Sequence, residues 1–89
     1  MDKVYLFIGN WEDATTDPTT ETRVEGVFST MELAYNRLTD YFKTELADYF
    51  EKFGFANVVF SFNKDRALIT NSENTSRTKF YIKEFKIDK

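Results

Sequence analysis

A repeating apolar pattern between Ser29 and Gly54 constrains the fold of this chain more than any other feature of its sequence. Apolar residues recur there in steps of three and four, the spacing that places side chains on one face of an α-helix. This face would consist of Met31, Ala34, Leu38, Phe42, Leu46, Tyr49 and Phe53. Ser29-Thr30-Met31-Glu32 matches a capping box, with Ser29 as the cap, and Gly54 suits the position just after a helix. The sequence therefore predicts one helix of about six turns between these two residues.

Five shorter segments around this helix are typical of β-strands, because they are rich in alternating or continuous apolar residues. They are Lys3–Trp11, Arg23–Phe28, Ala56–Phe62, Arg66–Thr70 and Thr78–Ile87. Glu12–Thr22 contains five Thr and an Asp-Pro pair, so it is predicted to be a loop. In the last segment Phe80 and Phe85 have opposite parity, which indicates a bulge or a strand buried on both faces.

The order β-β-α-β-β-β predicts an α+β fold, with a single long helix packed on a mostly antiparallel sheet of four to five strands. Because the chain has 89 residues, it has room for one hydrophobic core, and residues 1–89 are predicted to form a single domain.

Composition removes several classes of function. The chain has no Cys and no His, so it cannot supply a zinc site, a Ser-His-Asp triad or a Cys-His dyad alone. No motif arranges its carboxylates for catalysis, and we expect neither an enzyme nor a cofactor. The acidic residues Glu12, Asp13, Asp17 and Glu21 could hold a hard cation, but their spacing matches no EF-hand. We therefore expect a solvated loop there and no metal site.

The apolar run Val4–Ile8 is too short for the core of a signal peptide or for a membrane span. Together with the absence of Cys, this predicts a soluble protein of the cytoplasm that does not enter a membrane.

One helix covers only one side of such a sheet, and the first strand is apolar on both sides. On this strand Val4, Leu6 and Ile8 face one way, and Tyr5 and Phe7 face the other. Val59 and Tyr81 have the parity to join Tyr5 and Phe7 in an uncovered patch, if the side chains that face the helix are Val58, Phe60, Phe62, Phe80 and Ile82. The residues of this predicted patch are Tyr5, Phe7, Val59 and Tyr81. The predicted function is therefore protein–protein interaction or regulation through this face, with a second copy of the chain or a host protein as the partner.

Charge is segregated along the chain, which has a formal net charge of -3. The predicted helix carries the acidic residues Glu32, Asp40, Glu45, Asp48 and Glu51. An acidic face can mimic a phosphate backbone, so the alternative function is inhibition of a nucleic-acid-binding host protein. The simpler explanation is an ordinary solvated helix face.

The C-terminal part is basic, with Arg66, Arg77, Lys79, Lys83, Lys86 and Lys89 among Phe80, Tyr81 and Phe85. Bases beside aromatic residues on a sheet can bind single-stranded nucleic acid, the second alternative function. The acidity of the whole chain makes a nucleic-acid partner the less favoured one. Charges that protect an edge strand from aggregation are the simpler explanation.

Three segments together follow the order of an opening strand, a Gly-apolar-aromatic-Ser-Thr entry into a helix, and a closing strand. They consist of Val4–Ile8, Gly26–Thr30 with Glu32 and Ala34, and Phe80, Ile82, Glu84, Phe85, Ile87 and Asp88. In this order the chain resembles a small family of uncharacterised domains from bacteria and their phages. The resemblance implies the fold and an origin in a phage or mobile element, and it implies no known activity.

Overall fold

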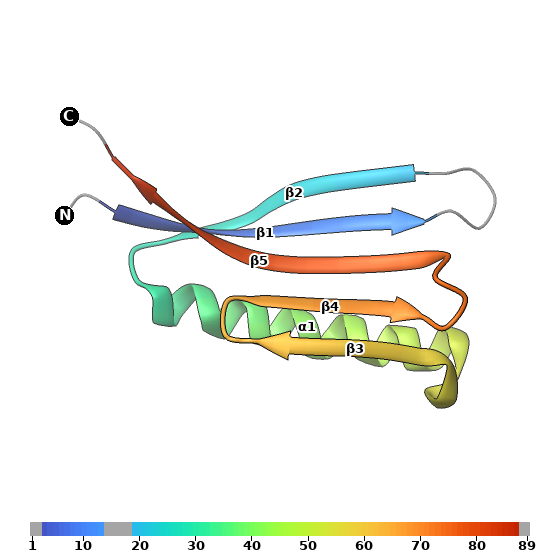
Figure 1. Cartoon of the computed structure of the whole chain (residues 1–89). Helices are drawn as coiled ribbons and strands as arrows, with labels where there is room; N and C mark the ends of the chain where they lie inside the picture. Colours follow the sequence, from blue (N-terminus) through green and yellow to red (C-terminus); the bar gives the residue numbers. More distant parts are fainter. Residues whose placement is uncertain (1–2, 14–18, 88–89) are drawn as a thin grey trace.

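The computed structural model describes residues 3–13 and 19–87. Within these residues it contains an α-helix, α1 (Met31–Phe53), followed by a short 3-10 helix, η1 (Phe55–Asn57). The five strands are β1 (Lys3–Asp13), β2 (Thr19–Phe28), β3 (Val58–Asn63), β4 (Arg66–Asn71) and β5 (Ser76–Lys86) (Figure 1). The element order and the α+β class agree with the prediction from sequence.

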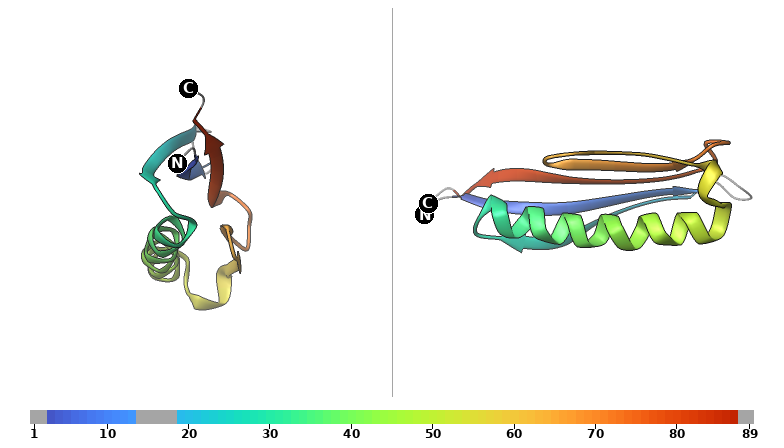
Figure 2. Two further views of the ribbon diagram at one scale, coloured as in Figure 1. Left: turned by 90° about the vertical axis from the view of Figure 1, so that its left-hand side faces the viewer. Right: turned by 90° about the horizontal axis from the view of Figure 1, so that it is seen from below.

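The strands form one sheet in the order β2-β1-β5-β4-β3, and every neighbouring pair is antiparallel. β5 is therefore the central strand, and β2 and β3 are the two edges. The helix lies along one side of the sheet, and the strands curve around it (Figure 2). We call the side of the sheet opposite α1 the open face; it is turned toward the viewer in Figure 1.

The helix starts one residue later than its capping box predicts. Thr30 has an extended backbone and is the N-cap, and its Oγ1 accepts a hydrogen bond of 3.2 Å from the backbone N–H of Leu33. The assignment of Ser29 as the cap is therefore wrong. Either hydroxyl residue can cap a helix, so adjacent Ser and Thr leave the start ambiguous by one position. Gly54 ends the helix as predicted, with a φ of 88° and its N–H bonded to the carbonyl of Phe50.

The β1–β2 hairpin is longer than predicted. β1 continues to Asp13 and β2 begins at Thr19, so the loop prediction for Glu12–Thr22 is wrong at both of its ends. Thr is a favourable strand residue, because its branched Cβ fits a pleated surface. The Asp-Pro pair of the predicted loop, at residues 17–18, lies outside the described residues.

The bulge expected in the last strand occurs in β2 instead. Phe7 pairs with Gly26 and Ile8 pairs with Val24, so Glu25 is an extra residue in β2. The bulge places Val24 on the same face as Val27, three residues later. β5 pairs with β1 without any shift, so the first alternative for the last strand, a bulge, is wrong. The second alternative, burial on both faces, is wrong as well, since Phe85 is 53% exposed.

The core lies between α1 and the sheet. Its buried apolar residues from the helix are Ala34, Leu38, Phe42 and Tyr49, and those from the sheet include Phe7, Ala67, Ile69, Phe80 and Ile82. Leu46, another member of the predicted helical face, is only partly buried and packs against this cluster. From Ala34 to Phe53 the helical face predicted from the three-and-four spacing meets the sheet, whereas Met31, at the start of that face, is 38% exposed.

Candidate interaction surface

The structure contradicts the predicted position of Phe7. Its side chain is 0% exposed and lies against the ring of Tyr41 on α1. Phe7 pairs with Ile82 across β1 and β5, and residues directly opposite each other in a sheet point to the same face. Tyr5 has the parity of Phe7 and packs against the core as well. Neither residue belongs to an uncovered patch.

The physical reason for this error is the two-sided apolar character of β1. A strand that is apolar on both faces does not reveal which face meets the helix, and exchanging the faces moves every side chain to the other side of the sheet. The assignments for β3 and β5 were right: Val59 and Tyr81 lie on the open face, because they pair with Thr70 and with Ile8.

Apolar side chains do cover much of the open face, but they are a different set. The pairing places there Val4, Leu6, Ile8, Val24, Val27, Val59, Leu68, Tyr81 and Phe85. Val24 and Val59 are each 58% exposed, and Val27 and Phe85 are also more than half exposed. Exposed apolar side chains on one face of a sheet are the usual mark of an interaction site.

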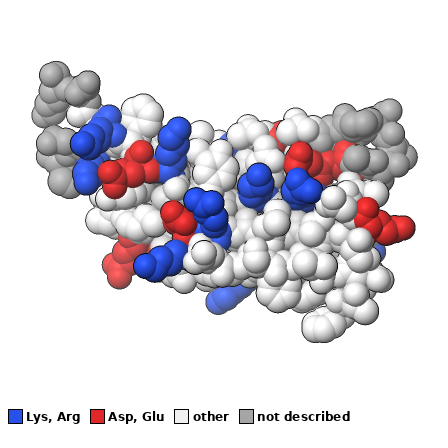
Figure 3. Space-filling model, in the orientation of Figure 1, with Lys and Arg blue, Asp and Glu red and all other residues white. Residues whose placement is uncertain are grey.

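A row of cations crosses this apolar surface along the central strand. Arg77, Lys79 and Lys83 alternate with residues buried beneath the sheet, and Tyr81 and Phe85 share their face. Figure 3, which views the open face, shows Lys and Arg side chains across its middle. The simpler explanation for these charges was the protection of an edge strand. It does not apply to β5, because β5 is the central strand of the sheet.

Three other members of the basic set do not contribute to the described open face. Phe80 is buried in the core, and Lys86 pairs with Lys3 on the face of Phe7. Lys89 lies outside the described residues.

A shallow groove of about 440 Å³ lies on the open face over β3, β4 and β5. Among its lining residues are Ser61, Arg66, Leu68, Lys79 and Tyr81. Arg66 lies directly across from Tyr81, and Leu68 directly across from Lys79. Arg66 lies 3.6 Å from the carboxylate of Asp65, and its side chain is largely exposed. The groove therefore places two cationic groups beside an aliphatic and an aromatic side chain, which suits a carboxylate next to an apolar group.

The acidic residues of α1 do not form one continuous stripe. Glu32, Asp40, Asp48 and Glu51 are exposed, whereas Glu45 is only partly exposed and turns toward β5. Glu32 and Glu45 are about 140° apart around a helix of 3.6 residues per turn. The predicted acidic face is thus divided between solvent and a pocket.

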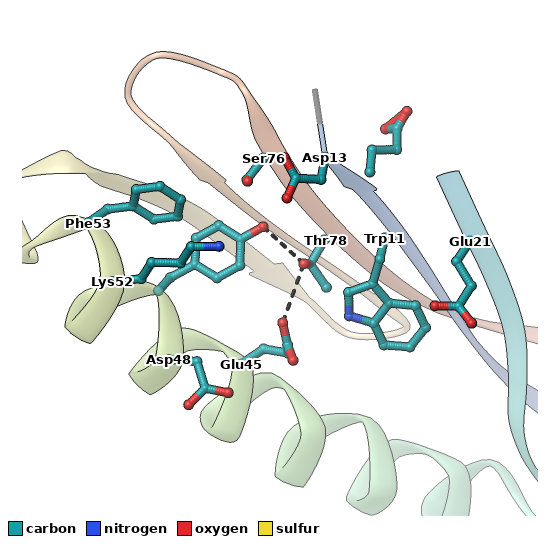
Figure 4. Close-up of a pocket in the computed structure, with 11 residues that line it drawn as sticks. Trp11, Asp13, Glu21, Glu45, Asp48, Lys52, Phe53, Ser76 and Thr78 are labelled. Atoms are coloured by element: carbon teal, nitrogen blue, oxygen red, sulfur yellow. Dashed lines mark hydrogen bonds between the residues drawn. The ribbon is translucent and has the colours of Figure 1, made fainter. Parts of the chain in front are cut away.

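This pocket has a volume of about 330 Å³ and lies between the second half of α1 and the ends of β1 and β5 (Figure 4). Tyr49 donates a hydrogen bond of 3.0 Å to the hydroxyl of Thr78, which donates at 3.4 Å to Glu45. Burial, and then the nearby charge of Asp48, raise the pKa of Glu45 above its ordinary value of 4.5. Burial is also the main reason that the pKa of Tyr49 is raised.

The acidic residues considered for a cation do not form a metal site in the part of the chain that the structure describes. Glu12 is on the open face, where its carboxylate lies 3.8 Å from Arg77, and Asp17 lies outside the described residues. Asp13 and Glu21 line the pocket of Figure 4, and Glu12 also borders it. Within residues 3–13 and 19–87, no three carboxylates are placed to hold a metal ion.

Comparison of the chain with protein-family models, with curated proteins and with solved structures found no match. The resemblance to a bacterial and phage family therefore stays a prediction. In the part of the chain that the structure describes, no helix is both long enough and apolar enough to cross a membrane.

Proposed function

We propose that this protein is a non-enzymatic binding protein that recognises an acidic protein partner through the open face of its sheet. The observation that carries this proposal is the row of Lys79, Tyr81, Lys83 and Phe85 on the central strand, flanked by uncovered apolar side chains. A partner segment that combines carboxylates with apolar side chains complements this surface in both charge and hydrophobicity.

The composition of the open face favours a protein over a nucleic acid. Single-strand binders stack bases on exposed aromatic rings, but most exposed apolar groups on this face are aliphatic, such as Val24, Val27 and Val59. The net charge of -3 also opposes a long phosphate backbone more than it opposes a short acidic segment.

The groove on the open face supports a specific mode of contact. A carboxylate of the partner would bind between Arg66 and Lys79, while an apolar side chain beside it would contact Leu68 and Tyr81. Charge-assisted hydrogen bonds of this kind fix orientation and speed association, and the apolar contact supplies most of the affinity. As part of the same proposal we place the protein in the cytoplasm, in a regulatory role.

Affinity capture from a host lysate tests the proposal, with the chain as bait before and after nuclease treatment. The test variant is Lys79→Glu with Lys83→Glu, which reverses two exposed charges on the open face. The matched control is Lys43→Glu with Lys52→Glu, which makes the same change of net charge on α1. We expect a protein that survives nuclease, is lost with the open-face variant and is kept by the helix control.

Two results would contradict the proposal and point to the alternatives. If nuclease removes everything that the bait captures, and a single-stranded oligonucleotide binds it at micromolar concentration, the surface binds nucleic acid. If Asp40→Lys with Glu51→Lys abolishes capture while the open-face variant keeps it, the acidic helix is the functional surface.

A further inference from the structure

The outer edge of β3 carries no charge. Residues 53–63 form the longest stretch of the chain without Asp, Glu, Lys or Arg, and they include the whole of β3. β3 pairs with β4 on one side only, in an unbroken register. In the view from below, α1 does not cover this strand (Figure 2, right). Among residues 3–13 and 19–87, no strand pairs with this outer edge, and an open edge of this kind favours pairing with a further strand.

The opposite edge of the sheet is protected, and β3 is not. On β2, Arg23 forms ion pairs with Glu21 at 3.5 Å and with Glu25 at 3.3 Å, and Glu25 forms the bulge. Charges and bulges are the usual devices that prevent edge strands from associating. β3 has neither a charged residue nor a bulge, so neither device opposes association at this edge of the sheet.

An exposed aromatic cluster continues this edge. Phe55 on η1 is 80% exposed and stacks on Phe50 of α1, with ring centroids 4.8 Å apart. Phe50 in turn contacts Phe60 on β3, which is 50% exposed. These three rings, the edge cluster, leave apolar surface beside an unpaired strand, where burial would be favourable.

We propose that two copies of this chain form a symmetric dimer by antiparallel pairing of β3 with β3 of the second copy. A second copy suits this edge because two identical chains of net negative charge repel each other least where neither carries a charge. The proposal does not depend on the open face having a partner.

The symmetry fixes the arrangement of the dimer. A two-fold axis that makes two identical strands antiparallel stands perpendicular to the sheet, so both helices lie on one side. The two edge clusters then meet on the helix side, and the two open faces form one continuous surface. A single dimer thus presents two rows of cations, one from each central strand.

Light scattering coupled to size-exclusion chromatography tests the dimer, at concentrations up to about 1 mM, where a contact of micromolar strength is saturated. We expect wild type to reach twice the monomer mass of 10.5 kDa. Val59→Lys should shift it to the monomer mass, because it places a charge on β3. Val24→Lys adds the same charge at an equally exposed valine of β2 and should leave the dimer intact. A monomeric wild type, or equal dissociation by both variants, would overturn the proposal.

A second variant keeps the test informative if Val59→Lys unfolds. The chain has no Cys, so Ser61→Cys introduces a single thiol on β3 near the centre of the proposed interface. Mild oxidation should link the two copies of this variant, because opposite residues in an antiparallel pair lie within disulfide distance. Thr20→Cys on β2 is the control and should stay unlinked. Linkage of the control and not of Ser61→Cys would also overturn the proposal.

Discussion

The ring of Phe7 on β1 meets the ring of Tyr41 on α1 edge-on, with centroids 4.9 Å apart and planes at 80°. Phe80 of the central strand contacts both rings, at 5.6 and 6.1 Å between centroids. The edge-on arrangement of Phe7 and Tyr41 is a favourable geometry for a pair of aromatic rings. The contact determines which side of β1 faces the helix, and therefore which residues remain on the open face.

Truncation of Phe7 should destabilise the protein strongly. Because the side chain is fully buried, Phe7→Ala should lower the free energy of unfolding by about 3–5 kcal/mol, through lost transfer energy and a cavity. Urea unfolding measures the loss. Leu6→Ala, one residue earlier and partly exposed on the open face, is the control and should cost clearly less. A larger loss for Leu6→Ala than for Phe7→Ala would mean that Leu6, and not Phe7, faces the helix.

The capping hydrogen bond of α1 predicts that substitutions of the adjacent residues Ser29 and Thr30 differ in their effect on stability. Thr30→Ala removes the acceptor of the Leu33 N–H and should cost about 0.5–2 kcal/mol, whereas Ser29→Ala should cost little. Thermal melts of both variants measure the difference. A larger loss for Ser29→Ala would restore the capping box that the sequence predicts and move the start of the helix back by one residue.

The raised pKa of Glu45 predicts a specific dependence of stability on pH. Folding raises this pKa, so between pH 4.5 and the raised value the native state binds more protons than the unfolded state. Glu45 therefore lowers stability as the pH rises through this window, and the cost persists at neutral pH. Glu45→Gln removes the charge and keeps an acceptor for Thr78. We expect this variant to melt above wild type at pH 7, and this gain to shrink as the pH falls toward 4.5. A variant less stable than wild type at pH 7 would contradict the assignment.

The long helix and the class of the fold could be predicted because local signals determine them. Apolar spacing from Met31 to Phe53 places one face of α1 against the sheet wherever the strands lie, and Gly54 ends the helix through its own backbone freedom. The turn between β3 and β4 is local as well, since Asn63 pairs with Arg66 around Lys64 and Asp65.

The open face could not be predicted correctly because it depends on contacts between distant segments. The apolar pattern of β1 does not indicate which of its sides the helix covers. The bulge at Glu25, which sets the side on which Val24 lies, has no clear signal in the sequence of β2. Strand order decides how the cations of β5 are interpreted. On an edge strand the same residues would only discourage association, whereas β5 is the central strand. Strand order follows from long-range pairing, which the composition of one strand does not determine.

The central claim is that the partner binds the open face, and site-specific photo-crosslinking tests it most directly. Tyr81 would be replaced by p-benzoylphenylalanine, which keeps an aromatic ring on the central strand, and Ala47, exposed on α1, would receive the same group as the control. After irradiation in nuclease-treated host lysate, we expect a protein adduct from position 81 and none from position 47. An adduct from position 47 with none from position 81 would contradict the account.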